Sequence, residues 1–151
     1  MAPRLDYNVA APAGMKALGG VYGYVSQSLP RMLVNLVYLR ISLLNGCAYC
    51  IDMHSRDLTK DGLPQEKLVL VPVWHEAGDL FSEQEKAALR WAETVTRVAE
   101  TAVPEAEFEA VRAVFSEKEV ADLTIAIGLM NAYNRLAISF RNTPAAVKAA
   151  A

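Results

Sequence analysis

The sequence predicts an all-α protein, and three observations support this fold class. Apolar residues recur every three or four positions along most of the chain, which is the period of an α-helix. The serine-any-any-glutamate pattern of a helix N-terminus occurs twice, at residues 82–85 and 116–119. No segment keeps the alternation of apolar and polar residues that is typical of a strand. The 151 residues, 53% of them hydrophobic, fit one domain over residues 1–151.

Three helices are predicted in the first part of the chain. Apolar residues at helical spacing predict the first over residues 12–29. The second covers residues 30–44 and is apolar on nearly all sides, so we expect it to be buried. Asn45 is expected to cap the third helix, which runs over residues 47–60 and stops at residues 61–62.

The middle of the chain is predicted to hold a short helix, a loop and a longer helix. The short helix covers residues 64–71 and is ended by Pro72. Residues 73–81 contain turn-like residues and no sustained period, which predicts a loop. The first capping box then starts a helix at Ser82 that continues to about Val98.

The last part of the chain is predicted to add two helices and a tail. An amphipathic segment covers residues 104–115. The second capping box starts a long helix at Ser116 that continues toward Phe140. The alanine-rich tail from Pro144 is expected to be frayed.

Charge and hydropathy exclude several classes of partner. The 15 basic and 17 acidic residues lie without long blocks, and the net charge of −2 gives no field that would attract nucleic acid or acidic lipid. The N-terminal stretch has no apolar core of a signal peptide. The most apolar run, residues 32–44, is shorter than the about 20 apolar residues of a membrane span. We therefore expect a cytoplasmic protein without membrane or nucleic-acid partners.

The residues expected to carry chemistry are Cys47, Cys50 and His54. On a helix, the three-residue spacing of the cysteines puts them on one face with Cα atoms about 5 Å apart, within the range for a disulfide. His54 falls on the same stripe, four residues after Cys50, where it can exchange a proton with that thiol. Without an export signal, such a pair is more often catalytic, redox-active or metal-binding than structural.

Redox chemistry at this site needs a thiolate. A free cysteine has a pKa of about 8.5, and the helix N-terminus and His54 are the expected sources of a lower value. Attack of a thiolate on a peroxide O–O bond leaves a sulfenic acid, which a second nearby thiol converts to a disulfide before over-oxidation. Cys47 and Cys50 fit these two roles.

Three other interpretations of the cysteines stay open. Both cysteines could be small apolar core residues, with His54 a satisfied surface residue. The three residues could instead bind zinc, with His75 or a carboxylate as the fourth ligand. A thioredoxin fold is less favoured, because its motif follows a strand that this sequence lacks.

Residues 39–62, LRISLLNGCAYCIDMHSRDLTKDG, resemble the signature of the AhpD-like alkylhydroperoxidase family within the carboxymuconolactone decarboxylase superfamily. The resemblance continues through residues 73–96 and through residues 129–141, LMNAYNRLAISFR. It implies an AhpD-like bundle of about six to seven helices. It further implies assembly into homo-oligomers, commonly trimers or hexamers.

The resemblance also implies a peroxidase that holds no cofactor. The residue matching Cys50 attacks the hydroperoxide, the one matching Cys47 resolves the intermediate, and the one matching His54 belongs to a proton relay. An external dithiol, such as a lipoyl- or thioredoxin-like protein, is the expected reductant. The decarboxylase branch of the superfamily lacks this cysteine pair, so the pair favours the redox branch.

Two candidate relay residues depart from the peroxidases of the family. Asn35 stands where these have a glutamate twelve residues before the first cysteine, and Tyr49 stands where they have a histidine. Asn35 can form hydrogen bonds but cannot carry a proton. The leading hypothesis is a thiol-dependent peroxidase of antioxidant defence, and the alternative is a dithiol-exchange or redox-sensing module. A decarboxylase-type lyase and a zinc-binding structural protein are less favoured.

Overall fold

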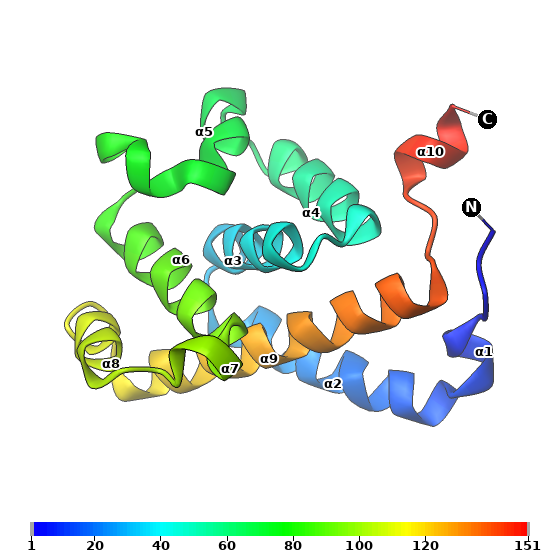
Figure 1. Ribbon diagram of the computed structural model, residues 1–151, viewed down its shortest axis with the longest axis horizontal. Helices are drawn as coiled ribbons and strands as arrows, with labels where there is room; N and C mark the ends of the chain where they lie inside the picture. The colour runs from blue at the N-terminus through cyan, green and yellow to red at the C-terminus, as the bar shows by residue number, and fades with distance from the viewer. Residues whose placement is uncertain (1, 151) are drawn as a thin grey trace.

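The computed structural model describes residues 2–150, and in that part of the chain every regular element is helical (Figure 1). The α-helices are α1 (Tyr7–Ala10), α2 (Pro12–Ser28), α3 (Arg31–Asn45), α4 (Ala48–Lys60), α5 (Gln65–Leu70), α6 (Glu83–Thr96), α7 (Val98–Thr101), α8 (Glu105–Arg112), α9 (Glu117–Phe140) and α10 (Ala145–Ala149). Two 3₁₀ segments, η1 (Val71–Glu76) and η2 (Gly78–Leu80), follow α5. The all-α prediction is confirmed. More segments form than the six to seven expected, because α1, α7 and α10 are single turns of four or five residues.

Helix α3 forms the centre of the molecule, packed against α4, α6 and α9 (Figure 1). Residues 33–42 are all buried, as the apolar pattern predicts. The buried cation on this helix is paired, because the Arg40 guanidinium donates to Glu93 Oε1 on α6 at 2.6 Å. The Trp74 indole in η1 donates to the same oxygen at 2.7 Å. The central helix is therefore fixed by apolar packing together with a satisfied ion pair.

The turn between α3 and α4 differs from its prediction. Asn45 is the last residue of α3 and does not cap α4. Gly46 adopts the left-handed conformation, with φ of 69°, and Cys47 N–H donates to the Ser42 carbonyl, a geometry that closes a helix at a glycine. The helix cap of α4 is Cys47, whose sulfur accepts from Cys50 N–H at 3.3 Å. Gly46 ends α3 sharply, and α4 begins two residues later at Ala48.

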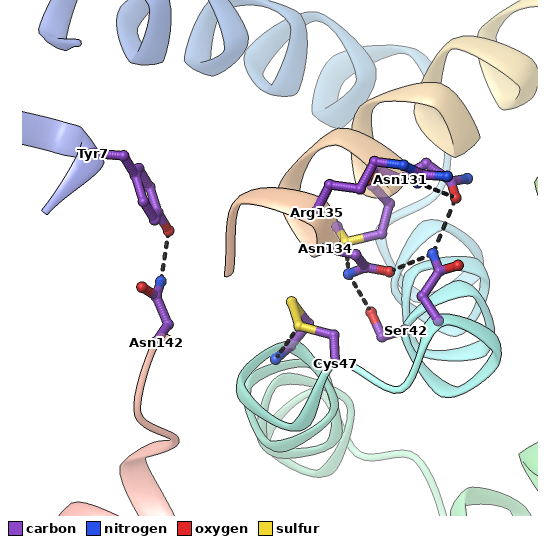
Figure 2. The surroundings of a disulfide bond; sticks show 10 residues. Tyr7, Ser42, Cys47, Asn131, Asn134, Arg135 and Asn142 are labelled. Atoms are coloured by element: carbon purple, nitrogen blue, oxygen red, sulfur yellow. Dashed lines mark hydrogen bonds between the residues drawn. A yellow bond between two sulfur atoms is a disulfide. The ribbon is translucent and has the colours of Figure 1, made fainter. Parts of the chain in front are cut away.

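The Asn45 side chain contributes to a buried polar network with α9. Its amide donates to Asn131 Oδ1 at 3.0 Å and to Asn134 Oδ1 at 2.9 Å. Asn134 is fully buried and donates in turn to Ser42 Oγ at 3.0 Å. Figure 2 shows Asn134 between Ser42 and Asn131, beside the start of α4. The network joins the end of α3 to α9 and so positions the turn that carries Cys47.

We expect Asn134→Ala to lower the free energy of unfolding by about 2–4 kcal/mol. The change leaves the Asn45 amide and Ser42 hydroxyl without their buried partner and opens a small cavity. Urea denaturation measures the effect. The control is Asn142→Ala, which removes one bond to Tyr7 at the half-buried end of the chain and should cost about 1 kcal/mol. Equal losses in the two variants would contradict a special role of the network.

Two predicted irregular segments are helical. Residues 73–81, expected as a loop, contain the end of η1 and the whole of η2, which are tight turns without the apolar period of an α-helix. The tail, expected to fray, contains α10, whose Ala146 N–H donates to the Asp52 carboxylate on α4 at 3.1 Å. This contact across 94 residues could not be predicted from the tail itself. None of the helices in residues 2–150 combines the length and apolar character that crossing a bilayer requires.

Candidate functional site

The two cysteines form a disulfide at the start of α4. Cys47 caps the helix and Cys50 lies in its first turn, and their Cα atoms are 5.3 Å apart. Both residues are nearly inaccessible, with Cys47 0% and Cys50 2% exposed. Ala137 of α9 and the Tyr49 side chain pack against them. The helical spacing thus brings the sulfurs together, and α9 covers them.

A cavity of about 330 Å³ reaches Cys50. His54 and Tyr49, two of the residues singled out from the sequence, border the same cavity. Its remaining wall is mostly aromatic and thioether side chains, from residues Tyr7, Met15, Tyr22, Met53, Met130 and Tyr133, with Asn8, Asp57 and Ala137. Tyr7 is held in place by Asn142, whose amide donates to the phenol oxygen at 2.6 Å (Figure 2). An organic oxidant can therefore approach Cys50 although the sulfur itself is buried.

His54 is a buried, neutral base. The residue is 2% exposed, and neither Nδ1 nor Nε2 has a hydrogen-bond partner among the described residues. Its ring packs against Tyr38 of α3, with 5.3 Å between the ring centroids. Burial lowers the pKa of His54 from 6.5 to about 4, so the imidazole is uncharged at pH 7. In this disulfide form His54 can accept a proton, but it cannot stabilise a thiolate as a standing cation.

The same burial predicts that acid destabilises the protein. Because the folded chain binds the His54 proton less tightly than the unfolded chain, the free energy of unfolding falls as the pH drops from 6.5 to 4. The loss reaches about 3 kcal/mol at pH 4. Urea denaturation at pH 7, 5.5 and 4 should show this loss in the wild type, and a His54→Gln variant should lack that share of it. A parallel decline in both proteins would contradict a depressed pKa for His54.

The two candidate relay residues lie in different places. Tyr49 borders the Cys50 cavity and also a second cavity, of about 450 Å³, next to Cys47. Asn35 is 7% exposed on α3 and does not border the Cys50 cavity. It borders a neighbouring cavity of about 460 Å³ together with Tyr38. Tyr49 therefore lies beside both cysteines, whereas Asn35 lines a neighbouring cavity that does not include them.

The ligand set considered for zinc is not assembled. His75 lies in η1, mostly exposed beside Glu76, and does not border either cavity next to the cysteines. Within residues 2–150 there is no group of three or more histidine, cysteine, aspartate or glutamate side chains that could hold a metal ion. Cys47 and Cys50 are instead bonded to each other.

Several cavity residues were not identified from the sequence. Tyr22 and Tyr133 both lie in predicted helices, but the helical pattern assigns neither of them to a site. Tyr38, whose buried hydroxyl has no hydrogen-bond partner among the described residues, was not singled out at all. Helical periodicity places such residues on an inward face, but it does not say which other helix they meet.

Comparison with known proteins places these features in a family. A model of the carboxymuconolactone decarboxylase family matches residues 11–94. The uncharacterised protein YdfG of Bacillus subtilis is 36% identical, over 96% of this chain and 99% of its own length. The uncharacterised protein YnjA of Escherichia coli is 32% identical over 64% of this chain and 52% of its own.

Solved structures share the fold. A protein of unknown function from Agrobacterium tumefaciens, suggested to be the antioxidant defence protein AhpD, is 40% identical with a TM-score of 0.90 over 95% of this chain and 98% of its own. The debrominase Bmp8 has a TM-score of 0.80 over 91% of this chain and 75% of its own. Bmp8 is 21% identical, so this likeness concerns the fold alone.

Proposed function

The chain belongs to the carboxymuconolactone decarboxylase family, and from this premise we propose that it is an AhpD-like, thiol-dependent peroxidase for organic hydroperoxides. One observation carries the proposal. The bonded cysteine pair meets a largely apolar cavity that also holds a buried, neutral imidazole. A redox pair, a base and a place for an organic oxidant thus occur together.

The first half of the proposed cycle oxidises the reduced pair. His54 accepts the Cys50 proton, and the thiolate attacks the terminal oxygen of ROOH, which breaks the O–O bond. The alkoxide takes the proton back from His54, giving ROH and a Cys50 sulfenic acid. The Cys47 thiol then attacks that sulfur, water leaves, and the disulfide forms. The sulfur pair loses two electrons and the hydroperoxide gains them.

The second half of the cycle restores the dithiol. A thiolate of an external dithiol attacks the disulfide, and its second thiol resolves the mixed disulfide. The two electrons and two protons of the donor pass to Cys47 and Cys50. The proposal needs no bound cofactor. The lipoyl- or thioredoxin-like donor, and the trimer or hexamer expected from the family, stay predictions that co-purification and light scattering can test.

The cavity favours organic hydroperoxides over hydrogen peroxide. Four phenol rings and three methionine side chains border it, and a volume of about 330 Å³ leaves room for an apolar substituent. Hydrogen peroxide would leave most of that surface without contact. We therefore expect a bulky aromatic hydroperoxide to react faster at equal concentration.

Dithiol exchange or redox sensing with little peroxidase turnover is the second candidate function. One observation favours it, which is that Asn35 offers no titratable group where the peroxidases of the family have a glutamate. Such a module would exchange disulfides with a partner quickly but would react with peroxide no faster than a free thiol.

A consumption assay tests the proposed function. Purified protein, a dithiol donor and either cumene hydroperoxide or hydrogen peroxide are mixed, and peroxide loss is followed against the donor alone. The proposal expects catalytic consumption that is faster with cumene hydroperoxide. Consumption no faster than that by the free donor, together with rapid exchange with an oxidised dithiol, would select the second function.

A further inference from the structure

Asp57 lies three residues after His54 on α4 and borders two cavities. It is half-buried, and residues at this spacing share a helix face. Asp57 borders both the Cys50 cavity and the neighbouring cavity that holds Asn35 and Tyr38. Tyr22 is the other residue that borders both. Asp57 therefore shares the Cys50 cavity with the buried imidazole.

The Asp57 carboxylate has no structural partner. Asp52 pairs with Arg56, Asp61 with Arg31, and Asp122 with Lys118. Within residues 2–150, the Asp57 side chain takes part in no hydrogen bond or ion pair. A structural hydrogen bond or ion pair therefore does not explain why a carboxylate stands at this half-buried position.

His54 needs such a group when the cysteines are reduced. Once its imidazole accepts the Cys50 proton it becomes a cation that is nine-tenths or more removed from water, and burial disfavours that charge. Both ring nitrogens are buried without a hydrogen-bond partner among the described residues, so no existing hydrogen bond offsets the positive charge. A nearby carboxylate stabilises the imidazolium and thereby makes the proton transfer less costly.

We propose that Asp57 is a positioning residue that stabilises the imidazolium form of His54 and thereby lowers the pKa of the Cys50 thiol. This role of Asp57 rests on the proposed function, but the Cys50 pKa that it affects can be measured on the reduced protein without any peroxide. Asp57 supplies a negative charge on the cavity wall that Asn35, on α3, cannot provide.

The phenols and the cation that line the two cavities do not offer this charge. They are phenols and one arginine, namely Tyr7, Tyr22, Tyr38, Tyr49, Tyr133 and Arg31. Burial raises the pKa of Tyr7, Tyr38 and Tyr133, so these phenols are neutral at pH 7. The Arg31 guanidinium is a cation that pairs with Asp61 at 2.7 Å. Asp57 is thus the carboxylate that lines the Cys50 cavity together with His54 in the described part of the chain.

The sign of one pKa shift tests the proposal. In a Cys47→Ser background, where the serine side chain still suits a helix cap, iodoacetamide alkylation against pH reports the Cys50 thiol pKa without any peroxide. If Asp57 acts through His54, Asp57→Asn raises that pKa by about one unit and slows alkylation at neutral pH roughly tenfold. If Asp57 only repels the thiolate, the same change lowers the pKa.

Two further variants complete the experiment. Asp57→Glu, which keeps the charge, should stay close to the wild-type pKa. Glu66→Gln removes one negative charge from the exposed surface of α5, at a residue that borders neither cavity, and should leave the Cys50 pKa unchanged. A lowered or unchanged pKa in Asp57→Asn would overturn the proposal, and so would an equal shift in Glu66→Gln. A protein without peroxidase activity that still shows the raised pKa would contradict the proposed function but not the role of Asp57.

Discussion

The Cys50→Ser variant is expected to lose hydroperoxide reduction entirely. Cys50 is the cysteine that borders the cavity with His54, and a serine hydroxyl neither ionises near pH 7 nor forms a stable oxidised state with peroxide. The catalysed rate should fall to that of the free dithiol donor. Peroxide consumption and circular dichroism, measured on the same preparation, separate lost chemistry from lost folding.

The matched variant is Cys47→Ser, which keeps the attacking sulfur and removes the resolving one. It should react once with hydroperoxide and then hold a sulfenic acid that dimedone traps, followed by over-oxidation in excess peroxide. The Cys50→Ser variant should therefore not react at all, whereas the Cys47→Ser variant should react once and stop. If Cys50→Ser instead reacts once and is trapped by dimedone while Cys47→Ser does not react, the roles of the two cysteines are reversed.

Replacing His54 by glutamine should slow the oxidation of reduced Cys50 about 100-fold or more at pH 7. The variant keeps a polar side chain of similar size but removes the base that accepts the thiol proton, and general bases contribute about 10²–10⁴ in rate. The remaining rate should rise steadily with pH, because hydroxide must then remove the proton. Single-turnover measurements on reduced protein from pH 6 to pH 9 test this expectation.

The natural control for His54 is the second histidine of the chain. His75 has a 56% exposed side chain in η1 and does not border the Cys50 cavity, so His75→Gln should react like the wild type. An unchanged rate in the His54 variant would show that another group accepts the proton. Equal losses in both variants would indicate a general effect on folding.

Much of the fold follows from local signals that the sequence contains. The capping boxes at Ser82 and Ser116 form with both reciprocal bonds, because each depends only on residues within one turn. The predicted cap at Asn45 is wrong, since its amide bonds with Asn131 and Asn134, which are more than 80 positions away. Helix α10 was missed because a long-range contact with Asp52 holds it. Errors of this kind arise where tertiary contacts decide the local structure.

The sequence predicts which residues form the candidate site, but it does not predict their burial or the cavity around them. Helical spacing alone puts Cys50 and His54 on one face of α4, and both border one cavity. The burial of His54, which makes it a neutral base, depends on packing against Tyr38 from another helix. The cavity combines side chains from α1, α2, α4 and α9, whose relative placement no periodic pattern specifies.

The central claim is that a hydroperoxide oxidises Cys47 and Cys50 to their disulfide through the folded site. It is tested most directly by reducing the protein, removing the reductant and adding one equivalent of cumene hydroperoxide. Each folded chain should consume one equivalent, lose two thiols and yield a peptide with a bond between residues 47 and 50. This oxidation should be faster than that of the urea-unfolded chain. Thiols that persist, or oxidation at the same rate in folded and unfolded chain, would contradict it.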